Sequence, residues 1–205
     1  MTKIKICGLR RECDTEYANL LLPEYIGFVF AEKSPRCVTP SAAARLRERI
    51  DARITAVGVF VDAPVDAVAA LLADGVIDAA QLHGGEDARY IARLRELCDA
   101  EIIKALPAGA DRREYEGADY WLFDSFRAGA SGGSGERFNW SELGAVTKPF
   151  FLAGGLTPEN AAAAIASVSP YCLDVSSGVE TEGYKDYEKM KRFVEAVRTP
   201  TKASH

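Results

Sequence analysis

Short apolar runs recur along the whole chain and alternate with longer segments in which apolar residues are spaced three or four positions apart. The short runs have the length of buried strands, and the spaced segments have the pattern of amphipathic helices that pack on a sheet. The predicted strands are Ile4–Cys7, Tyr25–Phe30, Ala56–Val61, Ala79–Leu82, Glu101–Leu106, Tyr120–Phe123, Pro149–Ala153 and Tyr171–Val175. The predicted helices include Ala42–Ile50, Val65–Leu72, Ala88–Leu97, Asn160–Ile165 and Tyr187–Val197.

Proline residues mark several of the predicted helix starts. Thr39 and Thr157 each stand directly before a proline, and Asp62 stands two residues before Pro64. An oxygen-bearing side chain at such a place caps the first backbone N–H groups of a helix, and proline fits the first helical turn. We therefore predict that a helix begins just after each of these three capping residues.

Strands without a polar face imply a parallel sheet whose outer side is covered by helices. The pattern repeats without a break in composition, so we predict one (β/α)8 TIM barrel over residues 1–198 and a short C-terminal tail over residues 199–205. A doubly wound open sheet is the structural alternative. That fold would place a glycine-rich fingerprint after the first strand, where this chain has only Gly8.

The composition narrows the class of partner. The formal net charge is -5 and no concentrated basic stretch is visible, so we expect no nucleic-acid partner. No apolar segment approaches the roughly 20 residues of a membrane span, and the N-terminus lacks the pattern of a signal peptide. We therefore expect no membrane partner and a cytoplasmic location.

Cysteine and histidine usage argues against a metal site. The five cysteines show no paired spacing of the zinc-ribbon or redox type, so we expect reduced thiols and no metal. A zinc site or a serine-histidine triad would have to depend on His83, because the only other histidine is His205 near the C-terminus.

Two predicted strands end in groups that can move protons, Cys7 and Asp124. The C-terminal ends of barrel strands face one pocket. A bulky side chain such as Trp121 and a covering loop would disfavour the charged form of Asp124, which would raise its pKa and make it a proton donor. A carboxylate that caps a helix or anchors a loop is an equally good interpretation of Asp124. Cys7 alone is interpreted as a buried apolar side chain, unless a cation such as Arg36 stabilises its thiolate. A solvated surface position is the alternative for Arg36.

The longest connection is the glycine- and serine-rich segment Arg127–Asn139, which follows the strand that ends at Asp124. A disordered insert is one interpretation. A mobile flap over the pocket is favoured, because barrel sites are built from the loops that follow the strands.

Two glycine-bearing turns follow the last two predicted strands. Gly154 and Gly155 form the first, and Ser177 and Gly178 belong to the second. Small residues let backbone amides approach an anion closely, and a short helix that begins at Ser177 would direct its positive end to the same point. Together the turns indicate a phosphate-binding cup, although glycines also simply close tight turns.

Two further polar residues could contact a ligand. His83 ends the fourth predicted strand, where a ligand contact and a structural hydrogen bond to a loop are equally good interpretations. Asp174 lies inside the last predicted strand and could reach a ligand or pair with a lysine inside the barrel. The residues alone leave both choices open.

Together these segments resemble the phosphoribosylanthranilate isomerase family of tryptophan biosynthesis. The resemblance extends from Lys5 to about Val197, with the segments in the family's order. It depends on Lys5-Ile6-Cys7-Gly8-Leu9, Ser34-Pro35-Arg36, Val57-Gly58-Val59-Phe60-Val61, Gln81-Leu82-His83-Gly84, Gly133-Ser134-Gly135 with Phe138 and Trp140, Leu152-Ala153-Gly154-Gly155-Leu156, and Asp174-Val175-Ser176-Ser177-Gly178-Val179-Glu180.

The resemblance implies a (β/α)8 barrel that needs no cofactor and carries out an Amadori rearrangement of a phosphosugar. By position, Cys7 resembles the general base, Asp124 the general acid and Arg36 a residue that orients the substrate. The two glycine turns resemble the phosphate cup. The implied partner is a small-molecule phosphosugar, and the implied state is a monomer or a homodimer.

Two positions depart from the family's pattern. Asn139 stands where the family's flap usually has aspartate, and Glu182 replaces a proline before Gly183, which is expected to loosen the last loop. The related isomerase of histidine biosynthesis, or a dual-substrate barrel, is an alternative function that would use an aspartate in place of Cys7. A barrel that only binds its ligand is the non-catalytic alternative.

Overall fold

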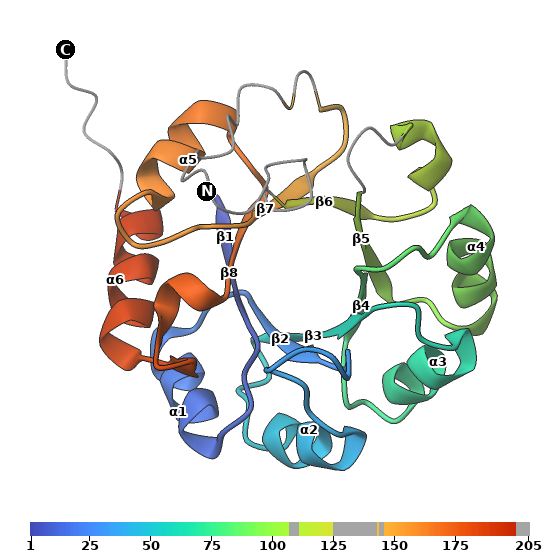
Figure 1. Cartoon of the computed structure of the whole chain (residues 1–205), viewed down its shortest axis with the longest axis horizontal. Helices are drawn as coiled ribbons and strands as arrows, with labels where there is room; N and C mark the ends of the chain where they lie inside the picture. The colour runs from blue at the N-terminus through green and yellow to red at the C-terminus, as the bar shows by residue number, and fades with distance from the viewer. Residues whose placement is uncertain (107–110, 125–142, 144–145, 200–205) are drawn as a thin grey trace.

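Eight parallel strands form a closed barrel in which each strand pairs with the next one along the chain and β8 pairs with β1 (Figure 1). A computed structural model describes residues 1–106, 111–124, 143 and 146–199. The barrel strands are β1 (Lys3–Cys7), β2 (Tyr25–Val29), β3 (Thr55–Phe60), β4 (Ala79–Leu82), β5 (Glu101–Ala105), β6 (Tyr120–Asp124), β7 (Phe150–Ala153) and β8 (Cys172–Val175). The predicted (β/α)8 barrel is confirmed, and the open-sheet alternative is excluded.

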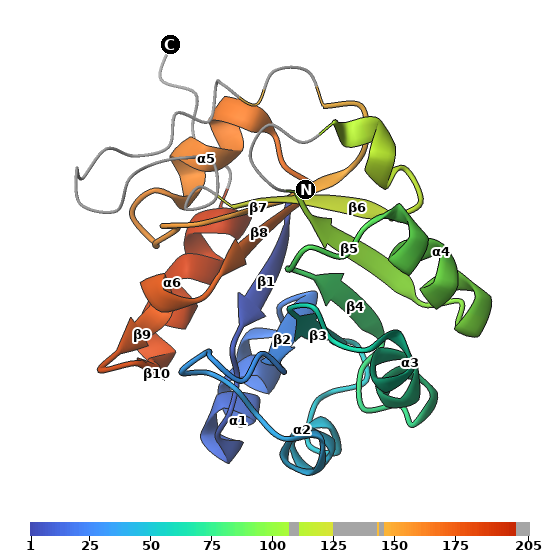
Figure 2. The ribbon, with the colours of Figure 1, turned by 45° about the vertical axis from the view of Figure 1, so that its right-hand side comes forward.

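Helices surround the barrel, as Figure 1 and Figure 2 show. They are α1 (Glu12–Leu21), α2 (Pro40–Arg47), α3 (Val65–Ala73), α4 (Ala88–Leu97), α5 (Ala161–Val168) and α6 (Tyr187–Arg198), with short 3-10 turns η1 (Arg112–Tyr115) and η3 (Ser177–Val179). A two-stranded hairpin of β9 (Glu180–Thr181) and β10 (Tyr184–Lys185) precedes α6. In the described part of the chain, no helix is long and apolar enough to cross a membrane. Residues 200–205 of the predicted tail lie outside the described residues.

The predicted strands agree with the observed ones to within a single residue at either end, but one helix is absent from the prediction. The helix α1 buries Asp14, Thr15 and Ala18, so its inner face carries little of the apolar pattern by which helices are predicted. Its first turn depends instead on Asp14, whose Oδ2 accepts the backbone N–H groups of Arg10 and Arg11 at 3.0 Å each.

Of the three predicted helix caps, one is confirmed and two are wrong. Thr39 caps α2, because its hydroxyl accepts the N–H of Ala42 at 3.2 Å. The helix α5 begins at Ala161 rather than beside Thr157, since the intervening residues form a turn in which the Thr157 hydroxyl accepts the N–H of Glu159. Asp62 does not cap α3; its Oδ1 accepts the N–H of Gly85 at 2.6 Å and joins two loops.

Alternation along the strands divides the core into two layers. The larger layer lies between strands and helices and includes Ile4, Ile6 and Trp121, whereas the smaller one includes Val57, Leu122 and other residues on the opposite side of the strands. The side chains of Lys5 and Cys7 alternate with Ile4 and Ile6 and therefore share the inner side of β1. Polar residues on the inner side of a strand are thus directed toward the barrel's axis.

Candidate active site

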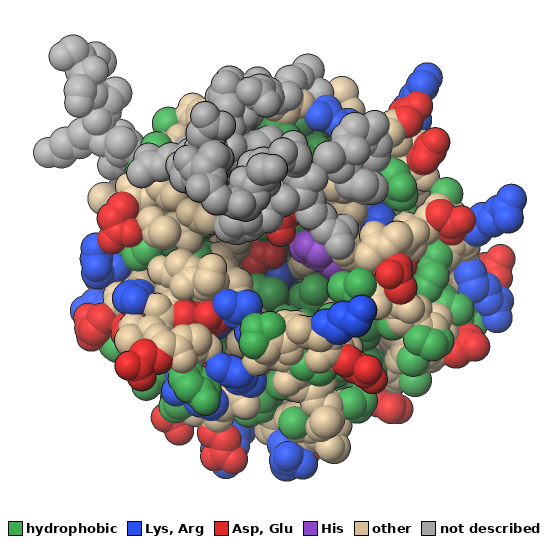
Figure 3. Space-filling model, viewed as in Figure 1, with side chains coloured by type: hydrophobic (Ala, Val, Ile, Leu, Met, Phe, Trp, Pro, Cys, Tyr) green, Lys and Arg blue, Asp and Glu red, His purple; other side chains and the backbone are tan. Residues whose placement is uncertain are grey.

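A cavity of about 340 Å³ opens at the C-terminal ends of the strands. Figure 3 shows acidic side chains and a histidine in the hollow at the centre of this face. Its volume is typical of small-ligand sites. The cavity brings together all the predicted site residues: Cys7, Arg36, His83, Asp124, Gly154, Gly155, Asp174, Ser177 and Gly178.

Cys7 ends β1 beside a glycine on the neighbouring strand. A Cβ atom on Gly27 would lie only 2.7 Å from the sulfur of Cys7, so the absence of a side chain there makes room for the thiol. Burial raises the pKa of the Cys7 thiol, whereas the nearby ammonium groups of Lys5 and Lys185 lower it. The cysteine is thus neither a simple core residue nor a surface thiol, because cations surround it.

Asp174 pairs with a lysine inside the barrel and also lines the cavity. Its Oδ2 accepts a hydrogen bond from Lys5 Nζ at 2.7 Å, and both side chains are buried. Burial raises the pKa of Asp174 although Lys5 opposes the shift. For Lys5, burial lowers the pKa, but the charges of Asp174 and Cys7 outweigh burial and raise it. The ammonium ion next to the Cys7 thiol is therefore a permanent feature of the site.

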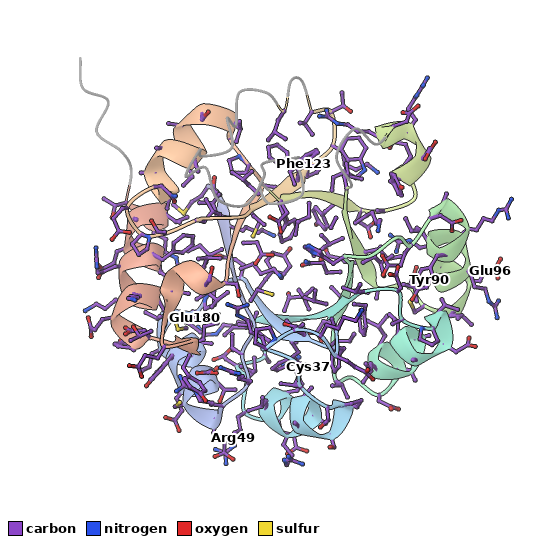
Figure 4. All side chains as sticks on the ribbon, in the orientation of Figure 1. Cys37, Arg49, Tyr90, Glu96, Phe123 and Glu180 are labelled. Atoms are coloured by element: carbon purple, nitrogen blue, oxygen red, sulfur yellow. The ribbon has the colours of Figure 1, made fainter. Side chains whose placement is uncertain are left out.

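Arg36 is held in a bidentate ion pair rather than free in solvent. Its Nε and Nη2 donate to the two carboxylate oxygens of Glu180 at 2.7 Å each, and Lys185 Nζ lies 2.5 Å from Glu180 Oε1. Burial raises the pKa of Glu180, but its hydrogen bonds to Arg36 and Lys185 outweigh burial and lower it. Figure 4 labels Glu180 at the rim of the barrel. A Cβ on Gly8 would lie 2.5 Å from Arg36 Cδ, so Gly8 lets the arginine cross β1.

Asp124 faces a histidine rather than the tryptophan expected to wall it. Trp121 lies on the other side of β6, where its Nε1 donates to the carbonyl of Tyr115 at 3.3 Å, so the prediction that its bulk shields the carboxyl group is wrong. Asp124 Oδ2 instead lies 3.6 Å from His83 Nε2, and His83 Nδ1 lies 2.8 Å from Gln81 Nε2. The three side chains form a line across the cavity from β4 to β6.

The two glycine turns meet at one side of the cavity. Gly154 and Gly155 have φ values of 87° and 61°, the left-handed region that favours glycine. A Cβ on Gly178 would lie 1.8 Å from the carbonyl oxygen of Leu156, so only glycine lets η3 approach the turn after β7. The N–H groups of Gly155, Ser177 and Gly178 donate to no other residue that the structure describes. They remain available to an anion.

Other parts of the site lie outside the predicted set or outside the described residues. Lys5, Gln81, Glu180 and Lys185 were not predicted, although Lys5 and Gln81 are polar residues that interrupt apolar strands, which is a usable signal. The predicted flap Arg127–Asn139, including position 139, lies outside the described residues. Among the described residues, no cluster of three or more histidine, cysteine or acidic side chains could hold a metal ion.

The substituted position Glu182 forms a regular hairpin turn. Glu182 and Gly183 have φ values of 51° and 79° and connect the antiparallel strands β9 and β10. Positive φ at both central residues is the geometry of a type I′ turn, which matches the twist of a hairpin. Arg10 Nη2 also donates to the carbonyl of Gly183 at 2.6 Å, so this loop is tied to the start of α1.

Comparison with known proteins agrees with this geometry. The sequence model of N-(5'-phosphoribosyl)anthranilate isomerase matches residues 4–196. The chain belongs to this family. A relative from Endomicrobium trichonymphae, named N-(5'-phosphoribosyl)anthranilate isomerase, is 44% identical over 202 residues, which cover 97% of this chain and 100% of the relative.

Solved structures of phosphoribosylanthranilate isomerases have the same fold. The crystal structure of the Thermotoga maritima isomerase is 31% identical, with a TM-score of 0.84 over 97% of this chain and 99% of that one. Another crystal structure of the isomerase contains reduced 1-(o-carboxyphenylamino)-1-deoxyribulose 5-phosphate; it is 29% identical, with a TM-score of 0.80 over 97% of this chain and 99% of that one. The resemblance inferred from the sequence is confirmed at the level of the family.

Proposed function

We propose that this chain isomerises N-(5'-phosphoribosyl)anthranilate to 1-(2-carboxyphenylamino)-1-deoxyribulose 5-phosphate, with Cys7 as general base and Asp124 as general acid. The observation that carries the proposal is the cavity itself, in which a thiol and a carboxyl group face one space beside two glycine turns. Family membership supports the overall reaction. The individual roles of the residues are our assignment.

The first two proton transfers each have a donor or an acceptor among the residues of the cavity. Asp124 gives a proton to the oxygen of the furanose ring while the bond from that oxygen to C1 breaks, which opens the sugar to an iminium ion. The iminium acidifies the C2–H bond, and the thiolate of Cys7 removes that proton to give an enolamine. The enolamine then gains a proton at C1 and loses one from its C2 hydroxyl group, which leaves the ketone. The substrate's own iminium accepts the electron pair.

The charges around Cys7 suit a base. Burial disfavours the thiolate and so raises the thiol's pKa, which makes the thiolate, once formed, a stronger base. The ammonium groups of Lys5 and Lys185 oppose this rise in the pKa and so favour formation of the thiolate. We therefore expect kcat/KM to rise with pH until the Cys7 thiol of the free enzyme is ionised, because the rising limb reports the essential base.

The shape of the cavity supports one orientation of the substrate. The unpaired N–H groups of the two glycine turns suit the phosphate, and Val29, Val59 and Val61 form an apolar wall that suits the aromatic ring. Arg36 lies near the same wall and suits the anthranilate carboxylate, with Glu180 fixing its guanidinium plane. The sugar then spans the space between Cys7 and Asp124.

The direct test follows the loss of anthranilate fluorescence when freshly made phosphoribosylanthranilate is mixed with the folded protein. Turnover above the uncatalysed rate is expected. Folded protein that binds the reduced product analogue without turnover would instead favour the non-catalytic barrel. Equal or better turnover of the aminoaldose substrate of histidine biosynthesis would favour the dual-substrate alternative. A cytoplasmic location and a monomeric or homodimeric state stay predictions.

A further inference from the structure

Gln81 is a buried amide that the proposed proton transfers do not use. It lies on the inner side of β4, is 2% exposed, and is the chain's only glutamine. Its Nε2 lies 2.8 Å from His83 Nδ1, and the opposite nitrogen of that ring, Nε2, lies 3.6 Å from Asp124 Oδ2. Gln81 therefore contacts the histidine that lies beside the proposed acid, and this contact calls for a chemical explanation.

The orientation of the amide sets the state of the ring. In the structure the amide nitrogen of Gln81 faces Nδ1 of His83, and because an amide nitrogen is only a donor, Nδ1 accepts the hydrogen bond in this orientation. A neutral imidazole that accepts at Nδ1 carries its single proton on Nε2. We propose that Gln81 is a positioning residue that holds neutral His83 in the Nε2–H tautomer and directs this N–H toward the carboxyl group of Asp124.

The neighbouring loop keeps the ring in place for this contact. The N–H of His83 donates to the carbonyl of Phe60 at 2.8 Å. Immediately after it, Gly84 accepts from Lys104 Nζ at 2.9 Å, and the same ammonium group pairs with the buried Glu86 at 2.9 Å. The backbone on both sides of the ring is thus anchored, and Gln81 sets which nitrogen carries the proton.

The consequence for catalysis rests on the proposed function, in which Asp124 becomes negatively charged as it protonates the ring oxygen. An N–H group directed at the developing carboxylate stabilises it and costs no reorganisation during the step. The other tautomer would direct a lone pair at the same carboxylate and repel it. Gln81 therefore acts on Asp124 through His83.

The tautomer can be measured without any turnover. The chain has two histidines, so [15N]histidine labelling combined with His205→Ala leaves His83 as the only imidazole signal. At an alkaline pH at which imidazole is neutral, two-bond proton–nitrogen correlations should show a protonated Nε2 and an unprotonated Nδ1. A wild-type ring protonated at Nδ1 would overturn the proposal, whether or not the protein is an isomerase.

Two variants of Gln81 should shift the tautomer of His83 to different extents. Gln81→Met removes the donor and should give a mixture of the two tautomers, whereas Gln81→Glu places an acceptor at Nδ1 and should move the proton there. Asn19→Asp, an equivalent amide-to-acid change on α1 far from the cavity, should leave the ring unchanged. An unchanged tautomer in folded Gln81→Met protein would contradict the role of the amide.

The kinetic measurement tests the catalytic half. Gln81→Glu should lower kcat by about 10²-fold, the lower end of the loss when one donor to a developing charge is removed, while affinity for the reduced product analogue stays within a few-fold. Gln81→Met should recover part of that loss. If the tautomer reverses and kcat does not fall, the link to Asp124 is wrong. Absence of turnover in the wild type would refute the isomerase assignment and leave the tautomer result standing.

Discussion

The two ends of the barrel both contain clusters of titratable side chains, but the two clusters differ in what lies between the strands beside them. At the C-terminal end of the strands, Cys7 and Asp124 face a cavity of about 340 Å³. At the other end, the hydroxyl groups of Tyr25, Tyr120 and Tyr171 meet at the barrel's axis. The rings pack on Phe151 at centroid distances of 5.3 to 5.8 Å and fill the interior.

The difference lies in how completely each cluster satisfies its own polar groups. The Tyr171 hydroxyl group contacts Lys3 Nζ at 2.5 Å and the hydroxyl groups of Tyr25 and Tyr120 at 3.2 Å each. At the cavity, in contrast, Gln81 Oε1 and Asp174 Oδ1 are buried without a hydrogen-bond partner in the described part of the chain.

Perturbed pKa values occur at both ends and therefore do not identify the active site by themselves. Burial raises the pKa of Tyr25 and of Tyr120 at the closed end, just as it raises those of Cys7 and Asp174 at the open end. Ion-pair and hydrogen-bond networks perturb pKa values wherever they are buried. A reactive cluster is distinguished by the polar groups that it leaves available to a ligand, such as Gln81 Oε1 and Asp174 Oδ1.

The largest expected effect concerns the thiol of Cys7, which faces the cavity, and the buried thiol of Cys172 is the reference. Cys7→Ala should lower kcat by about 10²–10⁴-fold, the contribution typical of a positioned acid or base, because no other group replaces the thiolate. Cys172 is fully buried inside the barrel near the tyrosines and serves as the matched control. Cys172→Ala should leave kcat unchanged in the same fluorescence assay. A Cys7→Ala enzyme with near-normal kcat at saturating substrate would make Cys7 structural.

The closed barrel could be predicted from the sequence because its strands are buried on both sides. A strand such as Phe150–Ala153 in β7 has no polar residue, so its apolar run coincides with its length. The helix α1 could not be predicted from the same signal, since its buried face contains Asp14 and Thr15. Its first turn is held by hydrogen bonds to Asp14, which no apolar pattern reveals.

The candidate site was predictable where a residue ends a strand and not where its role depends on a partner. Cys7 and Asp124 stand at strand ends, which the pattern locates. The partner of Arg36 is Glu180, 144 residues away, and no local spacing relates the two. Trp121 was expected beside Asp124, which was wrong. Successive side chains of a strand face opposite sides, so Trp121 faces the helices and Asp124 faces the cavity.

Removal of Lys5 should show what the buried ammonium group contributes to stability and to the pKa of Cys7. Lys5→Met leaves the buried carboxylate of Asp174 without its partner, so the free energy of unfolding should fall by about 3–5 kcal/mol in denaturant titrations. Because Lys5 lowers the pKa of Cys7, its loss should also move the rising limb of kcat/KM to higher pH.

The double variant Lys5→Met/Asp174→Asn provides the control for this prediction. It removes both charges and should recover part of the lost stability, since no unpaired ion stays buried. If Lys5 acts on Cys7 directly, the rising limb should stay displaced in the double variant, but by less than in Lys5→Met, because the charge of Asp174 raises the pKa of Cys7. An unchanged pH limb in folded protein would mean that Lys5 serves only the ion pair.

A smaller effect is expected at the glycine turns. Gly155→Asp places a carboxylate where the phosphate is proposed to bind, so affinity for the reduced product analogue should fall about tenfold, or roughly 1.4 kcal/mol. Gly75→Asp is the matched control, because Gly75 also has a positive φ of 67° and open space around its Cα but lies far from the cavity. Equal affinities in the two variants would move the phosphate to another part of the cavity.

The smallest effect is expected at the closed end of the barrel. Tyr171→Phe removes a hydroxyl group that three neighbours contact, so the free energy of unfolding should fall by about 1 kcal/mol, the usual net value of a hydrogen bond. Tyr184→Phe is the control, because Tyr184 is 46% exposed, and it should leave stability unchanged. Neither variant should alter kcat, since the tyrosine cluster lies at the opposite end from the cavity. A loss of kcat in Tyr171→Phe at unchanged stability would show that the two ends are coupled, and the closed end would then belong to the catalytic apparatus.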